Sequence, residues 1–179
     1  MSIPARPHEN CYWVTDYLMA GEYPGALMPD YARQRLAEIV DSGIRTFIDL
    51  TESTEPLRPY AGLVAELASE RHEALEYERF PIPDRGVTSP REMNAILDRI
   101  DRCIGEERPV YLHCWGGVGR TGTVVGCYLV RHGATPEDAM KAIASHWETV
   151  EKRFRHPCSP ETMEQLKMIR LWPTLKDAT

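Results

Sequence analysis

Residues 110–122 are, in order, Val110-Tyr111-Leu112-His113-Cys114-Trp115-Gly116-Gly117-Val118-Gly119-Arg120-Thr121-Gly122. The first three residues are apolar and partly β-branched, which predicts a short buried strand that ends at the cysteine. The stretch 121–131 carries apolar residues four positions apart and is followed by Gly133, a pattern typical of a helix and its end. Cys114 is therefore expected where a strand turns into a helix.

The segment between the cysteine and the arginine has the composition of an anion-binding turn. Its glycines permit steep backbone angles and bring backbone N–H groups close to a bound anion. The N-terminus of the following helix adds unpaired N–H donors and partial positive charge. Both effects favour the thiolate form of Cys114. We therefore predict a phosphate-binding loop with a nucleophile at its base; its members are Trp115, Gly116, Gly117, Val118 and Gly119.

Three side chains next to this loop have distinct expected roles. Arg120 supplies a planar fork that can bind two phosphate oxygens and stabilise them during transfer. Thr121 can place a hydroxyl near the cysteine sulfur and steady it as a leaving group. His113 precedes the nucleophile, so its side chain is expected to point away from the anion and to hydrogen-bond the loop backbone. We interpret it as a support rather than a base.

The pattern His-Cys, five residues, Arg and Thr resembles the signature loop of the protein-tyrosine phosphatase superfamily, with Cys114, Arg120 and Thr121 on its matching positions. The short chain is similar to the compact dual-specificity branch; the resemblance is sharp over residues 80–131 and looser elsewhere. It implies an α/β fold and hydrolysis of phosphomonoesters through a phosphocysteine intermediate, without a metal or a cofactor. The implied substrate is a protein or peptide carrying phosphotyrosine, with phosphoserine and phosphothreonine as further candidates.

Such a reaction needs an acid for the departing oxygen. The segment Phe80-Pro81-Ile82-Pro83-Asp84-Arg85-Gly86 supplies one, because its prolines stiffen the chain and Gly86 lets it turn behind Asp84. It resembles the general-acid loop of compact family members. Asp84 is the preferred acid in the first step and base for water in the second. Asp49 and Glu52, which follow another apolar strand, are the competing candidates.

The loop admits other interpretations. Residues 117–122 also fit G-x-G-x-x-G, a dinucleotide-binding fingerprint. The βαβ unit that carries this fingerprint requires a strand after the helix. Here Thr135-Pro136-Glu137-Asp138 instead opens a second helix. A non-catalytic phosphate-binding module and a phosphatase of a non-protein phosphomonoester remain as alternatives. The five loop residues before Arg120 include no lysine or arginine, which disfavours a multiply phosphorylated inositol substrate.

The whole chain, residues 1–179, is expected to form a single α/β phosphatase domain. Predicted strands cover residues 12–14, 18–20, 44–50, 75–82 and 110–113. Predicted helices cover 30–41, 59–72 and 121–131, and others begin at Ser89, Thr135 and Ser159, the last with Met163, Leu166 and Ile169 on one face. Because most helices follow a strand, we expect a central, mostly parallel sheet of four or five strands with helices on both faces.

Two features near the C-terminus admit a functional and a structural interpretation. The basic cluster Lys152-Arg153-Phe154-Arg155-His156 is expected to be a solvated loop, with a rim that attracts acidic phosphopeptides as the alternative. Gln165 resembles a glutamine that helps to position water in some compact family members. Trp115 is expected either to line the site or to pack.

The net charge and the cysteine content limit the classes of partner and the cellular compartment that we expect. A net charge of −6 argues against nucleic acid and anionic membranes as partners. No run approaches the length of a membrane span, and the N-terminal residues lack a secretion signal. Five cysteines without metal-ligand spacing fit a reducing compartment, and a cytoplasmic location is expected. Apart from the nucleophile, the cysteines are expected to be buried and inert; these are Cys11, Cys103, Cys127 and Cys158.

Overall fold

The computed structural model describes residues 5–176, which are built around one five-stranded sheet in the order β1-β2-β5-β3-β4. The strands are β1 (Cys11–Thr15), β2 (Leu18–Gly21), β3 (Thr46–Asp49), β4 (Glu76–Arg79) and β5 (Val110–His113). β1 pairs with β2 in the antiparallel sense, and the other three pairings are parallel. The predicted sheet of four or five mostly parallel strands is thereby confirmed.

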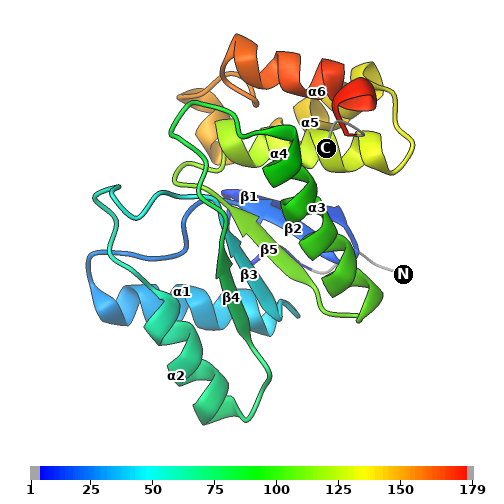
Figure 1. The fold of residues 1–179 in the computed structure, drawn as a ribbon. Coiled ribbons are helices and arrows are strands. Elements are labelled where there is room, and N and C mark those ends of the chain that lie inside the picture. The colour runs from blue at the N-terminus through cyan, green and yellow to red at the C-terminus, as the bar shows by residue number, and fades with distance from the viewer. Residues whose placement is uncertain (1–4, 177–179) are drawn as a thin grey trace.

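Helices cover both faces of this sheet. They are α1 (Pro29–Asp41), α2 (Ala61–Arg71), α3 (Pro90–Gly105), α4 (Gly119–Arg131), α5 (Pro136–Trp147) and α6 (Met163–Leu175), with a short 3₁₀ helix η1 (Glu151–Phe154) before α6. Figure 1 shows α1 and α2 on one side of the sheet and α4, α5 and α6 on the other. The prediction of helices on both faces is confirmed.

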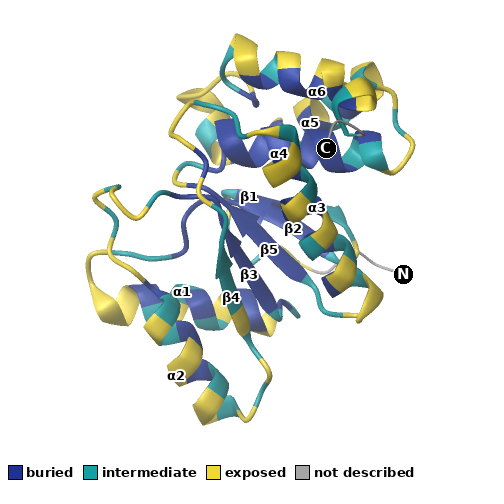
Figure 2. Cartoon of the chain, in the orientation of Figure 1, coloured by how far each residue is buried: buried dark blue, intermediate teal, exposed yellow. Residues whose placement is uncertain are grey.

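The core lies in two layers, one on each side of the sheet, and β5 contributes to both. Val110 and Leu112 pack in the layer beneath α3 to α6, whereas Tyr111 packs with α1 and α2. This alternation follows from the two-residue period of a strand. Figure 2 shows the resulting burial, with β2, β3 and β5 dark between the helices and the edge strand β4 less buried. A strand buried on both faces provides a rigid base for the loop that follows His113.

The predicted helix starts lie within two residues of the observed ones except at α6. Ser89 caps α3, its hydroxyl accepting a hydrogen bond from the Glu92 N–H at 3.2 Å. The expected start of the last helix at Ser159 is wrong, because α6 begins at Met163 after a capping box formed by Thr162 and Gln165. The Ser159 hydroxyl instead donates to the carbonyl of Val118 at 2.7 Å.

Of the three apolar residues expected on one face of the last helix, Ile169 is buried and Met163 is not. Met163 is 72% exposed, and the buried positions of α6 are Gln165, Met168, Ile169 and Trp172. A polar residue occupies this face because its amide is bonded to backbone groups, as described below.

Other sequence expectations concern strand ends and cysteines. β3 and β4 are shorter than predicted, because the chain leaves the sheet after Asp49 and after Arg79 to form loops at one edge. Cys11, Cys103 and Cys127 are buried as expected, but Cys158 is exposed, so the expectation of a buried thiol there is wrong.

Within residues 5–176, no helix combines the length and the apolar character needed to cross a membrane.

Candidate active site

The carboxyl ends of β2, β3, β4 and β5 lie at the same edge of the sheet, because these neighbours pair in parallel. Ligand sites of such sheets form in the loops that follow these ends. A pocket of about 330 Å³ opens there. Its lining includes seven of the predicted site residues: Asp84, Cys114, Trp115, Gly116, Val118, Gly119 and Arg120. The structure therefore brings the expected nucleophile, arginine and acid to one cavity.

The loop of residues 114–119 has the backbone expected of an anion cradle. Cys114 is 3% exposed at its base, and α4 begins at Gly119. Within the described part of the chain, none of the backbone N–H groups of residues 115–120 donates to a protein acceptor. Gly117 has φ +74°, a conformation that favours glycine, and a Cβ there would lie 2.6 Å from the carbonyl carbon of Gly21. The donors are thus left for a bound anion.

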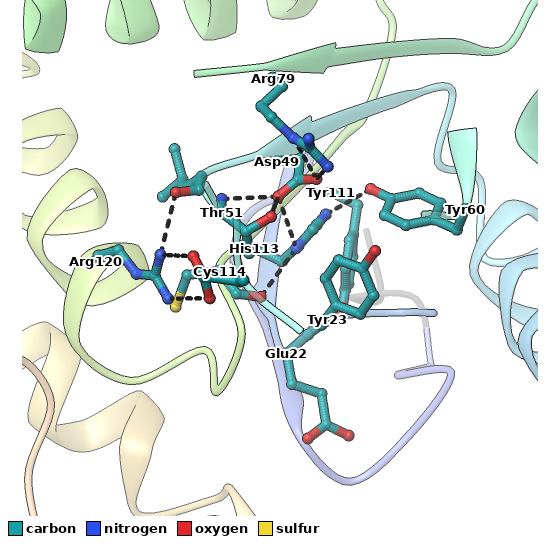
Figure 3. Close-up of polar contacts among 12 residues, drawn as sticks. Glu22, Tyr23, Asp49, Thr51, Tyr60, Arg79, Tyr111, His113, Cys114 and Arg120 are labelled. Atoms are coloured by element: carbon teal, nitrogen blue, oxygen red, sulfur yellow. Dashed lines mark hydrogen bonds and ion pairs between the residues drawn. The ribbon is translucent and has the colours of Figure 1, made fainter. Parts of the chain in front are cut away.

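Arg120 is held beside Cys114 by contacts that fix the plane of its guanidinium (Figure 3). Its Nη1 donates to Glu55 Oε1 at 2.6 Å and to the Ile82 carbonyl at 3.1 Å, and its Nη2 lies 2.9 Å from Asp84 Oδ1. Burial lowers the pKa of Arg120, but the hydrogen bond to Glu55 and the nearby negative charges outweigh burial and raise the pKa above its usual range. The guanidinium therefore remains charged.

His113 lies behind the nucleophile rather than in the pocket. Its Nδ1 is 3.0 Å from the Cys114 carbonyl, which can only accept, so Nδ1 carries the proton. Its Nε2 then accepts from the hydroxyl of Tyr60 at 2.5 Å. Burial lowers the pKa of His113, although the Asp49 carboxylate opposes this effect. The neutral ring thus bonds the loop backbone in the way expected of a support.

Of the three acid candidates, Asp84 alone lines the pocket. Asp49 is fully buried, and its carboxylate accepts from the Thr51 hydroxyl at 2.6 Å (Figure 3). It also accepts from the Tyr77 hydroxyl at 2.8 Å. Glu52 accepts from the backbone N–H of Asp84 at 3.4 Å. Asp49 therefore braces the sheet edge, and Glu52 contacts the loop that carries Asp84.

Two further predicted residues occupy positions that differ from their simple expectation. Thr121 is buried, and its hydroxyl has no hydrogen-bond partner among residues 5–176, so its role beside the Cys114 sulfur stays a prediction. Gln165 accepts from the N–H groups of Glu161 and Thr162, both at 3.2 Å, and donates to the Gly86 carbonyl at 3.1 Å. Gln165 thus ties α6 to the loop of Asp84 and does not line the pocket.

The structure also places at the site one residue that the sequence did not identify and two members of the basic cluster. Glu55 pairs with Arg120, but no spacing rule links position 55 to position 120, and the sequence carries no signal for it. Lys152 and His156 line the pocket. His156 is exposed and Lys152 is half-buried, so the structure is compatible with a solvated loop, and the alternative of a rim that attracts acidic phosphopeptides stays a prediction. The residues described by the structure contain no cluster of three or more His, Cys, Asp or Glu side chains suited to a metal.

Comparison with known proteins finds a matching family model and relatives of similar sequence. A family model described as polymorphic toxin system, DSP-PTPase phosphatase matches residues 25–134. Protein tyrosine phosphatase domain-containing protein 1 of Mus musculus is 30% identical over 166 residues, 88% of this chain and 21% of that protein. Phosphatidylglycerophosphate phosphatase PTPMT2 of Arabidopsis thaliana is 26% identical over 170 residues, 93% of this chain and 65% of that protein. The chain spans 21% to 50% of the length of the first three curated relatives.

Solved structures share the fold. Tk-PTP in its active form has a TM-score of 0.68 at 23% identity, covering 95% of this chain and 98% of that chain. PTPMT1 in complex with PI(5)P has a TM-score of 0.68 at 20% identity, covering 94% and 97%. The sheet, the loop and the family match agree: the chain belongs to the polymorphic-toxin-system DSP-PTPase phosphatases, compact members of the cysteine-dependent protein-tyrosine phosphatase superfamily.

Proposed function

We propose that this chain hydrolyses phosphomonoesters through a phosphocysteine intermediate on Cys114. The thiolate attacks phosphorus, and Arg120 with the N–H groups of Trp115, Gly116, Gly117, Val118 and Gly119 binds the phosphate oxygens. Asp84 protonates the departing oxygen and then accepts a proton from the water that releases phosphate. The observation that carries this proposal is the shared pocket of Cys114, Arg120 and Asp84 at the start of α4.

The position of Asp84 supports its role as the acid. Its Oδ1 lies 2.9 Å from Nη2 of Arg120, so a phosphate bound by the arginine would be within reach of this carboxyl group. The side chain is 57% exposed and stands on a loop at the pocket mouth, where a leaving alcohol would depart. The supporting roles of His113, Thr121 and Gln165 are part of this proposal, and neither a metal nor a cofactor takes part.

The proposed substrate is a phosphorylated protein or peptide, with phosphotyrosine first. Trp115 lines the pocket and is 45% exposed, which leaves its ring available to pack against the aromatic ring of a phosphotyrosine. Phosphoserine and phosphothreonine are further substrates in this proposal. The proposed site of action is the cytoplasm, because a nucleophilic thiol needs a reducing compartment.

A second candidate is an anionic lipid phosphomonoester. The observation that favours it is Lys152, a cation from outside the loop that lines the same pocket as Arg120. The Arabidopsis thaliana relative PTPMT2 is named as a phosphatidylglycerophosphate phosphatase. The negative charge of the chain and the absence of lysine and arginine between Cys114 and Arg120 favour the peptide over the lipid.

The deciding experiment compares phosphate release from matched phosphotyrosine and phosphothreonine peptides and from phosphatidylglycerophosphate vesicles, without added metal. We expect release from the phosphotyrosine peptide, its loss in Cys114→Ser, and retention in Cys158→Ser, which changes an exposed cysteine away from the pocket. Mass spectrometry of a rapidly quenched reaction should find phosphate on Cys114. Release of phosphate from the vesicles alone would make the lipid, and not the peptide, the substrate. Peptide binding without any release would instead favour a non-catalytic module.

A further inference from the structure

Two carbonyl groups of the phosphate-binding loop are held from its outer side. The carbonyl of Trp115 accepts from the N–H of Tyr23 at 2.9 Å. The carbonyl of Gly116 accepts from the ammonium group of Lys152 at 3.2 Å. In a planar trans peptide, the carbonyl of one residue and the N–H of the next point in opposite directions. These two bonds therefore direct the N–H groups of Gly116 and Gly117 toward the inner side of the loop, where a phosphate would bind.

The second of these peptides needs an external anchor more than any other in the loop. It joins Gly116 to Gly117, and a peptide between two glycines can rotate with little steric cost. A rotation would turn the Gly116 carbonyl toward the phosphate, where its partial negative charge would repel the anion. Within residues 5–176, the ammonium group of Lys152 is the only hydrogen-bond donor to the Gly116 carbonyl.

Lys152 is itself held by a buried carboxylate. Its Nζ lies 2.5 Å from Oε2 of Glu22, which follows β2 and is 11% exposed, and its backbone N–H donates to Asn10 Oδ1 at 3.1 Å. The other oxygen of Glu22 accepts from Arg35. Burial raises the pKa of Glu22, but the hydrogen bond and charge of Lys152, together with Arg35, bring the pKa below its ordinary value. Glu22 is thus charged at neutral pH and restrains the ammonium group.

The segment that carries Glu22 also contacts the loop directly. Gly117 packs on the backbone of Gly21, whose carbonyl oxygen would lie 2.6 Å from a Cβ at position 117. Glu22 and Tyr23 follow immediately at the end of β2 (Figure 3). The anchor is therefore built on the rigid edge of the sheet rather than on a free surface side chain.

We propose that Lys152, restrained by Glu22, is a positioning residue that holds the Gly116–Gly117 peptide with its N–H toward the phosphate. This inference rests on the proposed function of the loop. Lys152 acts here through the backbone, and its charge is balanced by Glu22, which distinguishes this role from a direct contact with a second anionic group of the substrate.

The test measures binding of inorganic phosphate by calorimetry, together with kcat and KM for p-nitrophenyl phosphate. Lys152→Met should weaken phosphate binding and lower kcat/KM at least about tenfold, because one oriented donor is lost. Lys152→Arg, which keeps a cationic donor, should retain most of the phosphate affinity and of kcat/KM. Lys141→Met removes the same charge from a residue 78% exposed on α5 and should change neither. Glu22→Gln should lower the phosphate affinity and kcat/KM as Lys152→Met does, but by a smaller factor.

Each remaining outcome overturns one statement. Unchanged phosphate affinity and kcat/KM in Lys152→Met would refute the positioning role. A loss confined to peptides with acidic neighbours, with phosphate binding intact, would also refute it and make Lys152 a direct substrate contact. If the unaltered chain binds phosphate but Cys114→Ser hydrolyses substrate equally well, the proposed function fails, while the phosphate-binding arm still tests Lys152. Melting temperatures of all variants exclude unfolding as the cause.

Discussion

The carboxylate of Glu55 holds the guanidinium of Arg120 through two parallel contacts, Nη1 to Oε1 at 2.6 Å and Nη2 to Oε2 at 3.1 Å. The two side chains are only 8% and 2% exposed. Such a two-point contact fixes the plane of the guanidinium as well as its position. Neither contact uses Nε, so the arginine is oriented before a phosphate arrives and keeps a donor for it.

Replacing Glu55 should therefore impair binding through Arg120. In Glu55→Ala we expect kcat/KM to fall at least about tenfold, because a misplaced guanidinium loses its fit to the transferring phosphate. The melting temperature should also fall, since the buried arginine loses its main counter-charge. Glu55→Gln keeps one acceptor oxygen and should lose less. Steady-state kinetics and thermal unfolding of both variants check this, and equal kcat/KM in all three proteins would contradict it.

Asp84 is expected to matter most for substrates with poor leaving groups. Asp84→Asn should slow turnover of a phosphotyrosine peptide roughly 100-fold while KM changes little, because the acid acts in the transition state. The loss should be smaller for p-nitrophenyl phosphate, whose leaving group needs less protonation. Glu161→Gln is the matched control, since Glu161 is another carboxylate in the lining of the pocket. A larger loss in the Glu161 variant than in the Asp84 variant would reassign the acid.

The parts of the site that the sequence predicts are those encoded in one contiguous stretch. Cys114, Arg120 and the intervening glycines lie between a strand and a helix, and local patterns determine both. Glu55 and Lys152 reach the same loop from far along the chain, 65 and 36 residues from their respective partners Arg120 and Gly116. Such contacts leave no periodic pattern in the sequence, because they depend on how the sheet brings separate loops together.

The error at the start of α6 has a related cause. Ser159 and Thr162 both fit the composition of a helix cap. Tertiary contacts distinguish them: the Ser159 hydroxyl bonds the Val118 carbonyl, and Thr162 caps the helix with Gln165. The sequence identifies Gln165 as a candidate, but its bonds to backbone groups become visible only when α6 is placed beside the loop that carries Asp84.

Gly117 should be the least replaceable glycine of the loop. Its φ of +74° disfavours any side chain, and a Cβ would lie 2.6 Å from the backbone of Gly21. We expect Gly117→Ala to lose most activity and to lower the melting temperature, because the loop and the end of β2 must separate. Gly62→Ala is the control: position 62 lies in α2, and a Cβ added there would meet no atom within 4 Å. That variant should retain activity and gain up to about 1 kcal/mol of stability.

The stability of the fold should decrease on acidification through His8. The Nδ1 of His8 accepts from the N–H of Asn10 at 3.2 Å, and its Nε2 lies 3.0 Å from the hydroxyl of Tyr111, which donates to the Glu22 carbonyl at 2.7 Å. Nε2 therefore donates and the ring is neutral. Burial, assisted by the charge of Arg35, lowers the pKa of His8 from 6.5 to about 4. Protonation would break the bond from Asn10.

The sign of the effect follows from proton binding. Between pH 6.5 and 4 the unfolded chain binds a proton at His8 and the folded chain does not, so the free energy of unfolding falls as pH falls through this window. The contribution is at most roughly 3 kcal/mol. His8→Gln should give a shallower dependence of unfolding free energy on pH, measured by denaturant titration. An unaltered slope in His8→Gln would assign the acid sensitivity to other groups, such as the buried His113.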